Sequence, residues 1–190
     1  MDYLSYCSKC PASVHCCTHH PEDGFVAVGI KNAERIREET GKEFSEFLDY
    51  SKLPDEMIKV CREDFEGSEG KLRASMLVGG RILRLKVKPN YECIFLDSEK
   101  KCSIYPIRPN ICSIYPYWYK KETGEREGEI KIIRHDEDPE CAVSINNHPK
   151  INFPEAEKSM LIEVAKKIEE EIEYCKKYLK EFVEKNKLMS

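Results

Sequence analysis

The sequence has few of the features that mark membrane or secreted proteins. No apolar run in its 190 residues approaches the roughly 20 residues that a helix needs to cross a bilayer. The N-terminal residues MDYLSYCSKC contain neither the basic segment nor the apolar stretch of a secretory signal. We therefore expect a cytoplasmic protein that does not associate with membranes.

The sequence also lacks the short motifs that identify common enzyme classes. It contains no glycine-rich nucleotide loop, no HExxH pair, no nucleophile elbow and no bacterial ferredoxin spacing. The net charge of −4, without a basic stripe and interleaved aromatic residues, gives no reason to expect a nucleic-acid partner. These absences leave open whether the protein catalyses any reaction.

What the sequence contains in abundance is cysteine, with ten residues of this type. In a reducing cytoplasm, clustered cysteines more often bind metal or carry out redox chemistry than form disulfides. Disulfides stay open as an alternative, because cytoplasmic proteins of hyperthermophiles can be rich in them, and so do reduced thiols. We take metal binding as the leading interpretation.

Eight of the cysteines fall into two groups along the chain. The first group has the spacing C-x2-C-x5-C-C, and the second surrounds the pentapeptide CSIYP, which occurs twice. A C-x2-C turn can direct two thiolates at one ion, and both zinc and iron–sulfur clusters accept cysteine thiolates as ligands. We predict that the two groups bind zinc, iron or an iron–sulfur cluster, at one site or at two. The predicted ligands are Cys7, Cys10, Cys16, Cys17, Cys93, Cys102, Cys112 and Cys141.

Other residues near these cysteines bear on the same site. Histidine can replace cysteine as a ligand, which leaves His15, His19, His20 and His135 open. Four thiolates around a divalent ion leave a net charge of about −2, which cations can offset. The candidate cations are Arg108, Lys100, Lys101 and Arg84, with a surface ion pair as the alternative role of Arg108. We expect aromatic side chains to exclude water from the site, namely Tyr105, Tyr115, Tyr117 and Trp118.

The pattern of apolar and turn residues predicts several short elements. FVAV at 25–28 is a short possible strand, and a helix through AERIREET begins at an Asn32 cap and ends at Gly41. A second helix runs from about Phe44 to Tyr50, and RILRLKVK at 81–88 reads as a strand after a Gly-Gly turn. The CSIYP copies cannot stay helical for long, because each proline disfavours the α region at the preceding tyrosine. KETGERE predicts a hairpin connection into the strand EIKIIRH.

Residues 155–187 form the clearest predicted helix. Its apolar residues follow a 4-3-4-3 spacing and therefore share one face. We expect this face to pack on the rest of the chain, with a homodimer or a protein partner as the alternative. The face consists of Leu161, Ala165, Ile168, Ile172, Cys175, Leu179 and Phe182. Cys175 is thus predicted to be a buried thiol, and we exclude it and Cys61 from the ligands.

The segment CIFLDSEKKCSIYPIRPNIC, followed by SIYP, resembles a family motif of the form C-x-FL…C-x-IY-x-x-RP-x-x-C with an aromatic-Pro after it. Together with the N-terminal Cys-Cys pair, it makes the chain similar to the cysteine-cluster family of the CxxCxxCC type, described as zinc- or iron-chelating domains. The resemblance covers roughly residues 7–145 and implies chelation by the matched cysteines. Flagellin lysine N-methylases have a similar cluster, so the resemblance also allows a distant link to enzymes. The matched positions are Cys93, Phe95, Leu96, Cys102, Ile104, Tyr105, Arg108, Pro109, Cys112, Tyr115 and Pro116.

Together these observations predict a small α+β fold, stapled by metal, with short strands, several helices and a long C-terminal amphipathic helix. We expect a metal-chelating domain over residues 1–150 and the amphipathic helix over 151–190. The predicted function is binding of zinc or an iron–sulfur cluster. An iron–sulfur redox protein or enzyme, and a metal-stabilised adaptor, are the alternatives.

Overall fold

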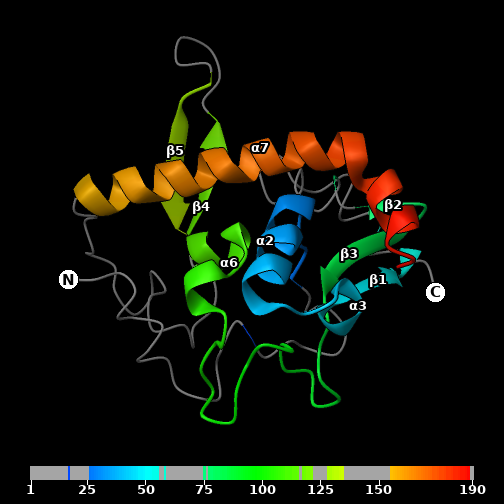
Figure 1. Cartoon of the computed structure of the whole chain (residues 1–190). Coiled ribbons are helices and arrows are strands. Elements are labelled where there is room, and N and C mark those ends of the chain that lie inside the picture. The colour runs from blue at the N-terminus through cyan, green and yellow to red at the C-terminus, as the bar shows by residue number, and fades with distance from the viewer. Residues whose placement is uncertain are drawn as a thin grey trace.

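The computed structural model confirms the α+β class and the long C-terminal helix. Its described elements are two small antiparallel sheets, short helical segments and one helix that lies across two others (Figure 1). The structure describes residues 17, 26–55, 58, 75, 77–115, 117–121, 128–134 and 155–188.

Helix α2, Ile30–Thr40, lies near the centre of the fold (Figure 1). Gly41 ends it as predicted, because its φ of 68° is left-handed and its N–H bonds the carbonyl of Arg37. The prediction for the other end is wrong, since Gly29 occupies the N-cap position and Asn32 lies inside the first turn. A partner distant in the chain, described below, makes a local capping side chain unnecessary.

A three-stranded antiparallel sheet has the order β1-β3-β2. Strand β3, Arg81–Leu85, follows β2, Leu77–Val78, through the predicted turn, in which Gly79 and Gly80 both have positive φ. The strand predicted over 81–88 ends at Leu85. The predicted helix over 44–50 is only partly present. Helix α3, Phe44–Phe47, ends where β1, Leu48–Lys52, begins. Pairing of β1 with β3, from Leu48 opposite Leu85 onward, overrides the local preference for helix.

In the described part of the predicted strand at 25–28, residues 26–28, the structure has a single bridge, between Ala27 and Arg84. Backbone hydrogen bonds on either side of it join Val28 N–H to the carbonyl of Leu83 and Leu85 N–H to the carbonyl of Val26. The segment entering α2 is therefore attached to β3.

The CSIYP copies adopt two different short structures. The first copy enters a 3₁₀ turn, η1, Tyr105–Ile107, and the second contains most of α6, Asn110–Ile114. Helix α6 ends at Tyr115, whose ψ of 139° is extended, as expected of the residue before a proline. Strands β4, Tyr117–Lys121, and β5, Ile130–Arg134, then pair in antiparallel fashion, which confirms the predicted strand pair.

Helix α7, Glu155–Lys185, crosses over α2 and α6 and contacts β4 and β5 (Figure 1). All seven residues of its predicted apolar face are at most 8% exposed. Tyr119 donates a hydrogen bond to Glu169 on the same helix at 2.8 Å. The apolar face is therefore buried within one chain, while a dimer or a protein partner stays a prediction.

None of the helices in the described ranges combines the length and the apolar composition that crossing a bilayer requires.

The core of the described residues is a single cluster that includes side chains from α2, the three-stranded sheet, the 93–104 loop, β4 and α7. Helix α7 therefore contributes to the same core as the cysteine-bearing loops.

Candidate metal centre

The predicted ligands divide between described residues and the rest of the chain. Cys7, Cys10, Cys16 and Cys141 lie outside the described residues, as do Cys61 and the four candidate histidines. Cys17, Cys93, Cys102 and Cys112 lie within them, and no disulfide joins any two of these four.

The N-terminal cysteine group meets the second group at one backbone contact. The N–H of Cys93 donates to the carbonyl of Cys17 over 2.7 Å, although 76 positions separate the two residues. Cys93 is 6% exposed, and Cys17 is half-buried and packs against the core. The end of the C-x2-C-x5-C-C segment therefore lies beside the first cysteine of the second group.

A compact loop holds Cys93 and Cys102. Cys93 forms an antiparallel bridge with Val87, and Cys102 forms one with Leu96. The tip of this loop is closed by Asp97, whose carboxylate accepts hydrogen bonds from the N–H groups of Glu99, at 2.9 Å, and Lys101, at 2.8 Å. Such side-chain bonding to nearby amides is the reason that aspartate favours turns. The stretch DSEKK thus sets the spacing between two candidate ligands.

Cys112 lies on the short helix α6 and is half-buried. Pro109 precedes the helix, and the N–H of Ser113 bonds the carbonyl of Pro109 at 3.0 Å. Between Cys102 and Cys112, the chain passes through η1 and then through Arg108 and Pro109 into α6. The segment from the last residue of η1 to the first residue of α6 is called the turn at residues 107–110 below.

Three of the four candidate cations are paired with carboxylates. Arg84 bonds Asp49 at 2.9 Å, Lys101 bonds Glu99 at 2.7 Å, and Lys100 bonds Glu92. The hydrogen bond from Lys100 lowers the pKa of Glu92, so this carboxylate is charged at neutral pH.

Arg108 differs from these cations because it is buried. It is 9% exposed, and its guanidinium carbon lies 4.1 Å from the centre of the Tyr105 ring. Its Nε donates to Ser113 Oγ at 3.3 Å. Arg108 therefore does not lie at the surface, where the alternative role in a surface ion pair would place it. Of the predicted aromatic wall, Tyr117 and Trp118 are buried, whereas Tyr105 and Tyr115 are half-buried.

The described residues alone do not assemble a complete metal site. Within those ranges, no group of three Cys, His, Asp or Glu side chains is placed so that it could hold an ion. A four-ligand site that uses the described cysteines therefore requires ligands from residues outside the described ranges.

Cys175 is buried in α7, in agreement with its predicted place in the apolar face. It is 1% exposed, and its Sγ accepts a hydrogen bond from Ile30 N–H at 3.4 Å. Burial raises the pKa of its thiol to about 12, so it carries a proton at neutral pH. Its burial on the apolar face of α7 agrees with its exclusion from the predicted ligands.

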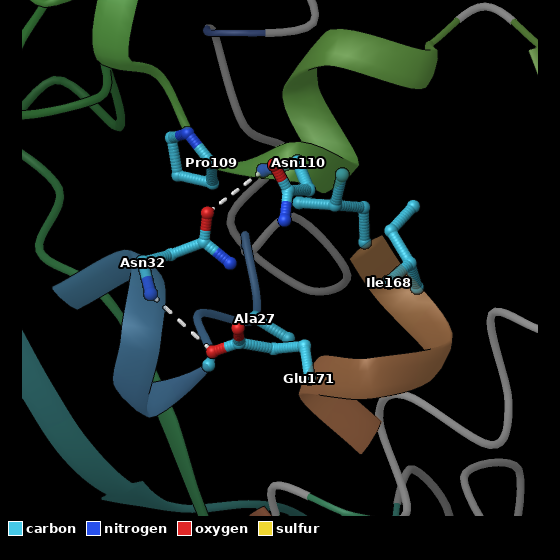
Figure 2. A pocket seen from close by; sticks show the side chains of 8 residues that line it. Ala27, Asn32, Pro109, Asn110, Ile168 and Glu171 are labelled. Atoms are coloured by element: carbon cyan, nitrogen blue, oxygen red, sulfur yellow. Dashed lines mark hydrogen bonds between the residues drawn. The ribbon is translucent and has the colours of Figure 1, made fainter. Parts of the chain in front are cut away.

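Three polar residues that sequence reasoning missed support the turn at 107–110, namely Asn32, Arg35 and Glu171. Asn32 Oδ1 accepts from the N–H of Asn110 at 3.1 Å, and Asn32 N–H donates to Glu171 Oε1 at 3.3 Å (Figure 2). Burial raises the pKa of Glu171, which is 2% exposed. The sequence could have indicated that Glu171 is buried, because it lies three residues after Ile168 and four before Cys175, beside the apolar face.

Asn32 and Glu171 also line a small cavity of about 10 Å³ between α2, α6 and α7 (Figure 2). Its remaining walls are mostly backbone and apolar side chains, from Ala27, Gly29, Pro109, Asn110, Ile111 and Ile168. The cavity is about the size of one water molecule and is too small for a cofactor.

Comparison with known proteins supports the family resemblance. Residues 6–142 match the family CxxCxxCC, described as a "Putative zinc- or iron-chelating domain". An uncharacterized protein of Methanocaldococcus jannaschii is 36% identical over 88 residues. This match covers 45% of the present chain and 41% of the length of that relative. No solved structure matches the chain significantly.

Proposed function

The chain belongs to the CxxCxxCC family of zinc- or iron-chelating domains, and on that basis we propose that its clustered cysteines bind one of these metals as thiolates. The proposed ligands come from both groups, namely Cys7, Cys10, Cys16, Cys17, Cys93, Cys102, Cys112 and Cys141. Eight thiolates suffice for two four-cysteine sites, and a smaller number would serve a single site.

The observation that carries this proposal is the hydrogen bond between Cys93 N–H and the carbonyl of Cys17. It supports a common site because it joins the backbone of the N-terminal group to that of the second group. The bridge between Leu96 and Cys102 brings the end of the same loop back toward its start. Ligands from segments far apart in the chain would therefore surround one region.

The donor chemistry of this region fits zinc and iron. Thiolates are soft ligands, which favour zinc and iron–sulfur clusters over magnesium or calcium. In the loop that holds Cys93 and Cys102, Glu99 and the preceding Glu92 are engaged with lysines and Asp97 with backbone amides, which leaves sulfur as the natural donor. A bound zinc would act as a structural crosslink between loops, and an iron–sulfur cluster would carry an electron.

A role as a crosslink implies that metal binding contributes free energy to folding. Because the thiols must be reduced to act as ligands, we propose a reducing compartment, the cytoplasm, as the site of action.

Anaerobic purification, metal analysis and a visible spectrum test the proposal. A colourless sample with zinc supports a structural zinc module, and a brown sample with iron and inorganic sulfide supports a cluster. Cys102→Ser and Cys112→Ser should each lower both the metal content and the melting temperature. A wild-type protein without metal, or mutants with unchanged metal content and stability, would contradict the proposal.

Cys175→Ala is the matched control for these mutants. It removes a buried thiol from α7 and leaves the cysteine-bearing loops unchanged. We expect it to lower the melting temperature while the metal content stays that of the wild type. This separates loss of ligand from general loss of stability.

A further inference from the structure

Side chains of α2 bond several backbone polar groups of the turn at residues 107–110. Arg35 Nη2 donates to the carbonyl of Arg108 at 2.8 Å and reaches the carbonyl of Ile107 at 3.5 Å. Asn32 Oδ1 accepts from the N–H of Asn110 at 3.1 Å. Pro109 has no N–H to satisfy. Two side chains therefore fix the direction in which the chain leaves the turn toward Cys112.

These two side chains are themselves fixed. Arg35 Nη2 donates to Asn32 Oδ1 at 2.8 Å, and Asn32 is only 4% exposed. The N–H of Asn32 bonds the carboxyl group of Glu171, which connects the first turn of α2 to α7 (Figure 2). A buried amide that bonds two partners has little freedom to choose another rotamer.

The position of the turn gives these contacts a meaning beyond packing. It lies between Cys102 and Cys112, and Asn110 is two residues from the second of them. Cys102 is held separately, by its bridge to Leu96. Bonds from Ser113 to Pro109 and from Arg108 to Ser113 act within the segment, whereas the bonds from α2 attach it to another element, so they contribute to where the α6 cysteine lies relative to the loop cysteine.

We propose that Asn32, supported by Arg35, is a positioning residue of the metal centre. It holds the 107–110 turn so that Cys112 is placed for the metal before the metal binds. This inference rests on the proposed function. Without the amide, metal binding itself has to order the turn, and the conformational free energy lost in doing so weakens the affinity. Groups that orient metal ligands typically contribute about 10- to 100-fold to metal affinity.

The test is titration of the full-length chain with Co²⁺, a spectroscopic probe of thiolate sites, in competition with a chelator. Asn32→Ala should bind Co²⁺ about 10- to 100-fold more weakly than the wild type. At saturating Co²⁺ its ligand-field bands should also shift, because one thiolate is misplaced. Asn32→Asp keeps an oxygen at the same place and should recover most of the affinity and the wild-type spectrum.

Two further variants separate positioning from stability. Leu161→Ala removes a buried side chain of α7 that has no hydrogen bond to the turn, and it should lower the stability while the Co²⁺ spectrum stays unchanged. Arg35→Lys keeps the positive charge but loses the guanidinium donors, and it replaces Asn32→Ala in the Co²⁺ titration if Asn32→Ala does not fold. It should weaken Co²⁺ binding less than Asn32→Ala is expected to.

The outcomes distinguish the two proposals. A wild-type chain that binds no Co²⁺ overturns the proposed function and this inference together. If the wild type binds, wild-type affinity and spectrum in Asn32→Ala overturn the inference alone. A spectral shift in Leu161→Ala equal to that in Asn32→Ala would also overturn the inference alone, because the shift would then follow from lower stability and not from the position of the turn.

Discussion

Gly29 lies at the N-terminal end of α2, where the carboxyl group of Glu171 takes the place of a capping side chain. A Cβ atom at residue 29 would lie 1.9 Å from Glu171 Oε1, 2.1 Å from its Cγ and 2.3 Å from its Cδ. These distances are far below van der Waals contact, so Gly29→Ala has to displace the carboxyl group. Because Glu171 is 2% exposed and the cavity beside it measures only about 10 Å³, its side chain has little space into which it can move.

The loss of stability expected for Gly29→Ala has two parts. Loss of a helix cap contributes about 1 kcal/mol, and a forced rearrangement of a packed side chain contributes about 1 to 3 kcal/mol. We therefore expect Gly29→Ala to lower the free energy of unfolding by about 2 to 4 kcal/mol. Urea unfolding followed by far-UV circular dichroism, at one fixed metal concentration, measures this value.

Gly41→Ala at the other end of α2 is the matched control. The φ of Gly41 is +68°, and nothing lies within 4 Å of an added Cβ. Its loss is therefore the backbone contribution alone, about 1 to 2 kcal/mol. A Gly29→Ala protein that is no less stable than Gly41→Ala would refute the steric reasoning.

A double-mutant cycle identifies Glu171 as the group that is displaced. The three heavy atoms nearest to the added Cβ all belong to the Glu171 side chain. In a Glu171→Ala background, Gly29→Ala should therefore lower the stability by only about 1 kcal/mol, giving a coupling of about 1 to 3 kcal/mol. Additive effects of the two substitutions would show that the clash lies elsewhere.

Three other substitutions or measurements follow from the structure. Burial raises the pKa of Glu171 above its ordinary value of 4.5. The stability that the protonated group contributes is therefore complete below pH 4.5 and is lost as the pH rises through the folded-state pKa. Glu171→Gln should remove this loss when the free energy of unfolding is measured over a series of pH values. Leu161 is 1% exposed, so Leu161→Ala should lower the free energy of unfolding in urea by about 2 to 5 kcal/mol. The adjacent Met160 is 42% exposed, so Met160→Ala should change it by less than about 0.5 kcal/mol. Cys175 should resist alkylation at mildly alkaline pH until the protein unfolds, because its pKa is raised. Peptide mapping by mass spectrometry measures the alkylation, and rapid labelling of Cys175 in the folded chain would contradict the raised pKa.

The sequence predicted best the elements that are determined by local pattern. All seven residues that the apolar repeat assigned to the inner face of α7 are buried, and the repeat did not include Glu171 and Val183, which are buried as well. Gly41 marked the end of α2 because a left-handed residue there is a local requirement. The Gly79-Gly80 turn and the β4–β5 pair were likewise visible in short stretches.

Long-range contacts were not predictable in the same way. Strand β1 exists because Leu48–Lys52 pairs with β3, whose residues lie 29 to 37 positions later, and nothing within that stretch distinguishes it from a continued helix. Asn32 was predicted to be an N-cap because its partners, Asn110 and Glu171, are 78 and 139 positions away. A side chain that bonds across such distances has no signature in its own neighbourhood.

The candidate metal centre was predictable in part. A common site required the two cysteine groups to approach each other, and the contact of Cys17 with Cys93 agrees with that requirement. Which sulfur atoms share a metal stays a prediction, because it depends on residues outside the described ranges. The support of the turn by α2 was not predicted, since it depends on how three distant elements pack.

Helix α7 gives the chain a boundary that homology alone would misplace. The family match ends at residue 142, yet α7 buries its apolar face against α2 and α6, and its Glu171 and Cys175 bond the first turn of α2. A shortened protein cut at the end of the match would expose that apolar surface to water and leave two amides without acceptors. We expect such a fragment to aggregate during expression, so recombinant work on the cysteine cluster should retain the chain through residue 188.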